Sequence, residues 1–161
     1  MKINKQNILE KIRAKVAEEA ENISLGAENA HLDATNDESQ SEGKYDTRGL
    51  EASYLAEAQA KLASEILHNL AIYNLLELKD FLPEDAISLS ALIELECDTK
   101  SALYFIGPKC GGIIIQEEGQ EILLITPTSP LGSALMGKQQ GDDFELQIGG
   151  NTRQYEIIAV Y

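Results

Sequence analysis

Two long stretches of the chain repeat their apolar residues at steps of three and four, which is the spacing of one face of an α-helix. In residues 6–32 the repeating set is Leu9, Ile12, Val16, Ala20, Ile23, Ala27 and Ala30. In residues 48–79 it is Leu55, Ala58, Leu62, Ile66, Leu70 and Tyr73. Each helix has one narrow apolar stripe, so we expect the two to pack together as an antiparallel coiled-coil hairpin.

The pattern changes after Pro83, which ends any helix that reaches it. Short apolar runs, separated by Gly, Asp, Asn and Thr, replace the helical spacing and predict β-strands. The expected strands are residues 89–97, 103–106, 113–115, 122–125, 144–148 and 154–161. A domain of strands over residues 86–161 is small but large enough for one core.

One short helix interrupts these strands. Ser129 is a good N-cap, and Pro130 suits the first helical position because its missing N–H costs nothing there. Gly149 and Gly150 predict a hairpin turn between the last two strands, since glycine accepts positive φ. The fold class that follows is α+β: a helical hairpin, then an antiparallel sheet domain with one short helix.

The segment that joins the two long helices is polar and acidic. Residues 33–47 contain five carboxylates and a single lysine, with Ser, Asn and Gly among them. We therefore expect two domains: residues 1–80, a hairpin with an acidic tip near 33–47, and residues 86–161.

The composition of the chain limits the classes of function that it can have. The net charge of −14 excludes nucleic-acid binding through a general basic surface, so we expect no direct DNA binding. No run of 18 apolar residues and no N-terminal signal core is present, which predicts a cytoplasmic protein without membrane contact. Cys97 and Cys110 are expected to be reduced thiols. No catalytic motif of an independent enzyme is found, so we do not expect an enzyme.

The last third resembles the C-terminal domain of the bacterial GreA/GreB transcription elongation factors. The resemblance is carried, in order, by Ser129-Pro130, Leu135-Met136-Gly137-Lys138, Gly141-Asp142 and Gly149-Gly150. It implies an FKBP-like fold that docks on RNA polymerase, with Ser129, Pro130 and Leu131 as the partner-binding residues.

The resemblance also gives the acidic tip a role. In that family the hairpin enters the secondary channel of RNA polymerase, and two tip carboxylates help to hold a catalytic magnesium ion. Counting back from Tyr45, Glu38 falls at the family's aspartate position, whereas Ser41 falls at its glutamate position, with Glu42 next to it. The candidate catalytic and magnesium-binding residues are therefore Asp37, Glu38 and Glu42, acting only with polymerase-bound magnesium.

The function that we expect is that of a monomeric accessory factor that stimulates cleavage of backtracked RNA by completing the polymerase active site. It would meet nascent RNA only there. Because Glu42 is displaced by one residue from the family's glutamate position, an alternative function is that of a non-cleaving regulator that inhibits polymerase through the same channel. A stand-alone FKBP-like prolyl isomerase is a further alternative. It would need an aromatic pocket, for which the domain offers Tyr104, Phe105, Phe144, Tyr155 and Tyr161.

Overall fold

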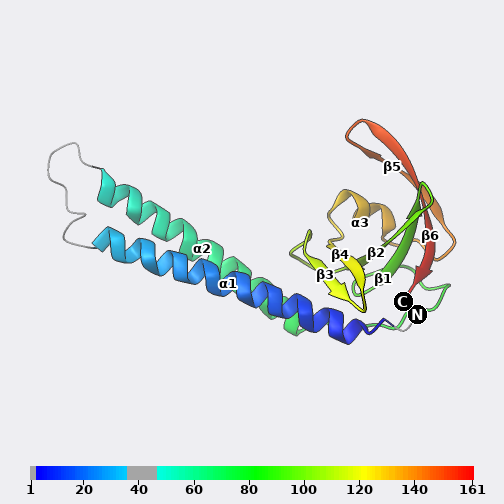
Figure 1. The fold of residues 1–161 in the computed structure, drawn as a ribbon, viewed down its shortest axis with the longest axis horizontal. Helices are drawn as coiled ribbons and strands as arrows, with labels where there is room; N and C mark the ends of the chain where they lie inside the picture. The colour runs from blue at the N-terminus through cyan, green and yellow to red at the C-terminus, as the bar shows by residue number, and fades with distance from the viewer. Residues whose placement is uncertain (1–2, 36–46) are drawn as a thin grey trace. The chain divides into compact units, whose positions relative to one another are not determined.

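The computed structural model describes residues 3–35 and 47–161. Two long helices precede six strands that form one sheet, and one short helix lies between the fourth and fifth strands in the sequence (Figure 1). The elements are α1 Lys5–Thr35, α2 Arg48–Asn74, β1 Leu92–Cys97, β2 Lys100–Ile106, β3 Ile114–Glu117, β4 Gln120–Ile125, α3 Pro130–Leu135, β5 Asp143–Ile148 and β6 Asn151–Val160. The predicted fold class is confirmed.

The chain forms two compact units, and both long helices contribute to each of them. The hairpin unit contains residues 13–71, and the sheet unit contains residues 1–12 and 72–161. These bounds differ from the predicted domains of 1–80 and 86–161. Whether the predicted segments act as separate domains stays a prediction.

In the hairpin unit α1 and α2 run side by side (Figure 1), but the inward face of α2 agrees with the predicted one only in its second half, at Ile66, Leu70 and Tyr73. Leu55 and Leu62 are 53% and 46% exposed. The inward positions of α2, buried or half-buried, are Ala56, Gln59, Ala63, Ile66, Leu70 and Tyr73, so the first three replace the predicted Leu55, Ala58 and Leu62. Their steps of 3, 4, 3, 4 and 3 keep a strict heptad, which the predicted set does not. The small alanines let the helices approach closely, and a Cβ on Gly26 would lie 3.4 Å from Gln59 Oε1.

The sheet has the strand order β3-β4-β2-β1-β6-β5, and it is mixed rather than purely antiparallel. β2 and β4 are parallel, from Leu103 beside Ile122 to Ile106 beside Ile125, whereas the other four pairings are antiparallel. The expectation of an antiparallel sheet is corrected at this pair. Residues 107–119 separate the two strands, which is long enough for the crossover that a parallel pair requires.

Tight turns close the three hairpins. Gly149 and Gly150 both have positive φ, as predicted, and so do the central residues of the other two turns, Asp98-Thr99 and Glu118-Gly119. Two successive left-handed residues match the twist of the flanking strands. The turns therefore fix which side chains of neighbouring strands point to the same face.

The two faces of the sheet are covered differently. α3 lies on the face that carries Ile93, Leu95 and Ile157, which are part of one buried cluster. The opposite face carries the buried residues Leu92, Leu103, Phe105, Ile115, Ile122 and Leu124. Ile8, Leu9 and Ile12 of α1 and Tyr73 of α2 are also buried, so the ends of the long helices complete the core of the sheet unit.

Polar contacts fasten these helix ends to the sheet unit. The carboxylate of Glu117 accepts hydrogen bonds from Asn7 Nδ2 at 3.0 Å and from Lys11 Nζ at 2.6 Å. The Tyr73 hydroxyl donates to the carbonyl of Lys109 at 2.5 Å. Burial raises the pKa of Tyr73 well above its usual range. A Cβ at Gly107 would lie 2.3 Å from this hydroxyl, so the loop can pass Tyr73 only because residue 107 has no side chain.

α2 ends at Asn74, five residues before the predicted end at 79. The last turn tightens, since Leu75 N donates to Ile72 O and Leu76 N to Tyr73 O. Beyond it, the backbone N–H of Lys79 donates to Ser90 Oγ at 3.0 Å. The apolar residues of 75–79 continue the helical spacing in the sequence, but this segment belongs to the sheet unit and forms no helix or strand.

Candidate functional site

The predicted tip residues, Asp37, Glu38 and Glu42, lie outside the described residues. α1 is described up to Thr35 and α2 from Arg48, so residues 36–46 are the connection between the two helices of the hairpin. Within 3–35 and 47–161, no three His, Cys, Asp or Glu side chains gather as metal ligands would. In the same ranges no helix is long and apolar enough to cross a membrane.

The predicted docking residues, Ser129, Pro130 and Leu131, begin α3 as the sequence indicates. Ser129 is the N-cap: its Oγ accepts from the backbone N–H of Gly132 at 3.1 Å and donates to the carbonyl of Thr126 at 2.8 Å. The Ser129 carbonyl accepts from Ser133 N at 2.8 Å. These bonds fix the loop before α3 and leave Pro130 exposed at the first helical position.

Gly132 makes this loop possible. A Cβ at this position would lie 2.0 Å from the carbonyl oxygen of Thr126. Any other residue would push the loop away from the helix. The close approach sets the direction in which Pro130 and Leu131 are presented.

The face of the sheet under α3 is only partly covered. α3 has six residues and buries Gly132 and Leu135, while other apolar side chains pack against the core and remain partly accessible. These partly buried side chains are Cys97, Tyr104, Leu123, Leu131, Ala134 and Leu146. We call these six residues, together with Pro130, the α3 face. An apolar surface at the edge of a core, next to a rigid loop, is typical of a protein-binding site.

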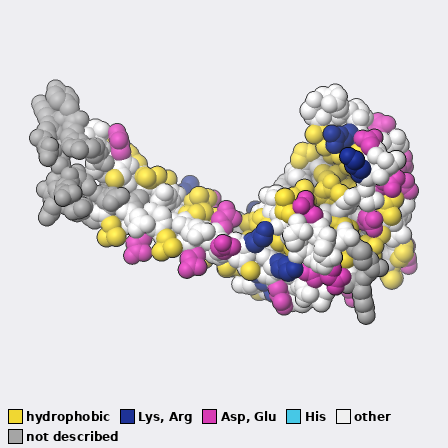
Figure 2. All heavy atoms as spheres, in the orientation of Figure 1, with side chains coloured by type: hydrophobic (Ala, Val, Ile, Leu, Met, Phe, Trp, Pro, Cys, Tyr) yellow, Lys and Arg dark blue, Asp and Glu magenta, His cyan; other side chains and the backbone are white. Residues whose placement is uncertain are grey.

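Basic side chains lie around the α3 face. Lys138 Nζ is 5.6 Å from the centre of the Phe144 ring, which stacks on Tyr155 at 5.3 Å. Arg153 is the direct cross-strand partner of Leu146, and Lys100 is that of Cys97, so both project from the same side of the sheet. Figure 2 shows hydrophobic atoms next to Lys and Arg side chains on this unit.

One ionisable group of the α3 face has a shifted pKa. Burial raises the pKa of the Tyr104 hydroxyl, and the nearby Tyr155 and Cys97 add to the shift, while Arg153 opposes it. Tyr104 therefore stays neutral and can offer an O–H to a partner.

Sequence analysis found the beginning of α3 but not the rest of this surface. Tyr104, Leu123 and Leu146 come from three different strands, and only the pairing of the strands brings them together. The period-two pattern could have placed each residue on a face of its own strand. It gives no order of strands, so the shared surface could not be derived from it.

Comparison with known proteins matches the C-terminal part of the chain. Residues 113–161 match the family model "Transcription elongation factor, GreA/GreB, C-term". The chain is 33% identical over 100 residues to transcription elongation factor GreA of Syntrophus aciditrophicus, covering 60% of this chain and 57% of that protein. It is 47% identical over 49 residues to GreA of Methylococcus capsulatus, covering 29% and 31%.

These matches are partial, and the chain spans about half the length of the curated relatives it matches, or less. Among solved structures, it is similar to the crystal structure of the GreA factor homolog 1 protein of Thermus thermophilus. That similarity has 20% identity and a TM-score of 0.39, and it covers 92% of this chain and 94% of that one.

Proposed function

We propose that the chain is a transcription elongation factor of the GreA/GreB type, which its partial matches support, and that it binds RNA polymerase and promotes cleavage of backtracked RNA. The observation that carries the proposal is the pairing of a helical hairpin, whose connection holds several carboxylates, with the α3 face on the sheet unit. The α3 face would dock the factor on RNA polymerase, and the carboxylates of the hairpin connection would take part in RNA cleavage.

Docking is assigned to the α3 face. Pro130 is exposed on a loop fixed by the Ser129 cap, and Leu131 is half-buried beside further accessible apolar residues. Apolar residues held on rigid backbone lose little entropy on binding and are suited to be anchors of an interface. Lys100, Lys138 and Arg153 around the apolar surface favour a partner segment with acidic residues at its margin.

Stimulation of RNA cleavage is assigned to Asp37, Glu38 and Glu42. Three carboxylates supply the hard oxygen ligands that magnesium prefers, so the donor set fits this metal. Magnesium, when it is bound jointly by the factor and the polymerase, supplies positive charge that favours attack of water on an RNA phosphodiester. The role of this chain is to bring the carboxylates to the metal. It is an accessory factor of a cytoplasmic enzyme, acts as a monomer and meets RNA only within the polymerase.

A second candidate function rests on Ser41, which stands where the family has a glutamate. A tip with one aligned carboxylate could occupy the channel without adding the second ligand. In this case the factor binds polymerase and slows it. The two candidates share docking and differ in cleavage.

Docking is tested in the full chain with Pro130→Ala combined with Leu131→Ala. We expect the Kd for RNA polymerase core enzyme, from fluorescence titration, to rise about tenfold, which corresponds to about 1.4 kcal/mol. The matched control is Glu145→Ala with Gln147→Ala, since both residues are exposed on the opposite face of β5. Equal affinity of the docking variant and the wild type, with unchanged circular dichroism, would show that polymerase binds elsewhere.

A further inference from the structure

The polar residue in the seam of the hairpin lies opposite a glycine. Gln59 Oε1 is buried without a hydrogen-bond partner among the described residues, and a Cβ on Gly26 would lie 3.4 Å from this oxygen. An unpaired buried oxygen disfavours the packed state, and a glycine inside a helix does the same because its backbone has the most freedom to lose. Two unfavourable features therefore meet at one level of the hairpin.

The two helices are packed differently on the two sides of this level. We call residues 13–25 and 60–71 the inner hairpin and residues 27–35 and 48–58 the outer hairpin. The inner hairpin buries Val16 and Ile66, whereas Ala56 is the one buried residue among the described side chains of the outer hairpin. Since stabilisation follows the apolar area removed from water, the outer hairpin is held less strongly. Its large apolar side chains are more than half exposed: Leu32, Leu50, Tyr54 and Leu55.

Two serines further disfavour the helical form near this level. Ser24 Oγ donates to the carbonyl of Ala20 at 2.8 Å, and Ser53 Oγ donates to the carbonyl of Gly49 at 3.0 Å. A hydroxyl that bonds to the carbonyl four residues back competes with the helical N–H and often bends the helix. One of these bonds lies just before Gly26, and the other lies within the outer part of α2.

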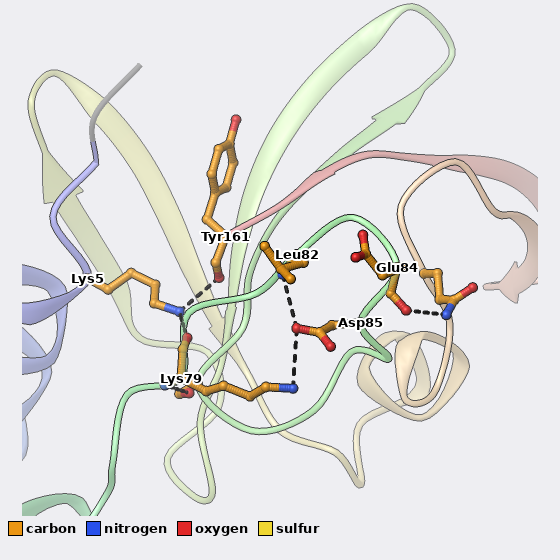
Figure 3. Close-up of polar contacts among 8 residues, drawn as sticks. Lys5, Lys79, Leu82, Glu84, Asp85 and Tyr161 are labelled. Atoms are coloured by element: carbon orange, nitrogen blue, oxygen red, sulfur yellow. Dashed lines mark hydrogen bonds and ion pairs between the residues drawn. The ribbon is translucent and has the colours of Figure 1, made fainter.

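The other ends of the two helices are fastened within the sheet unit. The ammonium of Lys5, in the first turn of α1, donates to the main-chain oxygen of Tyr161 at 2.9 Å and to the carbonyl of Lys79 (Figure 3). Near the end of α2, the Tyr73 hydroxyl donates to the carbonyl of Lys109. Because α1 begins and α2 ends at these contacts, we expect the helices to separate at their opposite ends.

We propose that the outer hairpin is a local opening unit, in which α1 and α2 separate and lose helix beyond Gly26 and Gln59 while the inner hairpin and the sheet unit stay folded. Isolated helices shorter than about 12 residues are marginal in water, so the outer segments unwind once they lose contact with each other. A partner that contacts both segments would bind the closed form and shift the equilibrium towards it. The opening occurs in the free chain, so it goes beyond the proposed function and is tested without RNA polymerase.

The test is hydrogen–deuterium exchange of the full chain, followed by pepsin digestion and mass spectrometry. After correction for intrinsic rates, backbone amides in residues 27–35 and 52–58 should exchange at least about 100-fold faster than those in residues 13–25 and 60–71. Local opening is sufficient to expose the first set, whereas the second set requires a larger unfolding event. Equal exchange in the two parts would mean that the hairpin opens as a whole and would overturn the proposal.

Substitutions distinguish opening at this level from ordinary fraying of helix ends. Gly26→Ala with Gln59→Met removes both unfavourable features and should slow exchange of the outer hairpin at least about tenfold, with exchange of the sheet unit unchanged. Asn22→Ala, exposed on α1 one turn before Gly26, is the matched control. It changes helix propensity alone and should slow exchange by no more than about threefold. No slowing by the double variant, or equal slowing by the control, would contradict an opening that is set by Gly26 and Gln59.

Discussion

The sheet unit and the hairpin unit bury different kinds of side chain. Large residues such as Phe105, Ile122 and Tyr73 are fully buried in the sheet unit. The hairpin unit buries Val16 and Ile66, but its other buried residues are the alanines Ala20, Ala56 and Ala63, and it leaves Leu55 and Leu62 exposed. Since stabilisation follows the apolar area removed from water, the sheet unit gains more free energy per residue. The hairpin relies on heptad geometry and on the close approach of its two helices.

The largest expected effect is the loss of a large side chain from the sheet unit. Phe105→Ala should lower the free energy of unfolding by about 3–5 kcal/mol, because it removes buried surface and leaves a cavity. Leu62→Ala in the hairpin is the matched comparison and should cost less than about 1 kcal/mol, since Leu62 is already half-exposed. Urea unfolding of both variants measures the contrast. Similar costs would mean that the hairpin contributes as much as the sheet unit.

The second prediction concerns a substitution that would shift the backbone of the loop before α3 rather than remove buried side-chain area. Gly132→Ala should cost about 1–3 kcal/mol, because its Cβ would overlap the carbonyl oxygen of Thr126 and the loop must shift. Ser133→Ala, one residue along α3 and exposed, is the control and should be nearly neutral. Thermal unfolding measures both. A neutral Gly132→Ala would show that the loop is pliable and that Pro130 is not held in one position.

A substitution at the buried polar residue of the hairpin, Gln59, should raise the free energy of unfolding rather than lower it. Gln59 Oε1 is buried without a hydrogen-bond partner among the described residues. Gln59→Met keeps the length and helix propensity of the side chain and removes the unpaired oxygen, so it should raise the free energy of unfolding by about 1 kcal/mol. Gln6→Met on the exposed side of α1 is the control. If Gln59→Met destabilises the chain, the amide has a partner in solution and sets the register of the helices.

The smallest effect concerns the acid stability of the contact between α1 and β3. Hydrogen bonds from Lys11 and Asn7 lower the pKa of Glu117. The folded pKa lies below the unfolded one, so this stabilisation is present above the unfolded pKa and is lost as pH falls through the folded value. Glu117→Gln should therefore lose less stability than the wild type between pH 6 and pH 3. Equal losses, with exposed Glu145→Gln as control, would mean that the contact contributes nothing to acid stability.

The sequence carried the information for local structure. The Ser129 cap, the Gly149-Gly150 turn and the approximate positions of the strands depend on neighbouring residues, and all three were predicted. The predicted face of α2 was wrong in its first half, because Leu55 and Leu62 are larger apolar residues than the adjacent Ala56 and Ala63, which are the buried ones. The parallel pairing of β2 with β4 and the contacts of Glu117 and Tyr73 join segments far apart in sequence. No local pattern encodes them.

The candidate functional site also combines residues that a local motif identifies with residues that only the tertiary fold brings together. The helix start at Pro130 was predicted from a local motif, and the docking role of Pro130 and Leu131 came from family resemblance. Tyr104, Leu146 and Arg153 join them only through strand order. The roles of Asp37, Glu38 and Glu42 came from family resemblance. They lie outside the described residues and stay a prediction.

The most direct test of the proposed function is a transcript-cleavage assay on RNA polymerase halted in a backtracked complex. The wild-type chain should release short 3′ RNA fragments, and Asp37→Ala with Glu38→Ala and Glu42→Ala should abolish release while polymerase binding persists. The matched control removes three exposed carboxylates from α1, Glu18→Ala with Glu21→Ala and Glu28→Ala, and should cleave normally. Cleavage by the tip variant at the wild-type rate, or a wild-type chain that binds polymerase and never cleaves, would contradict the account.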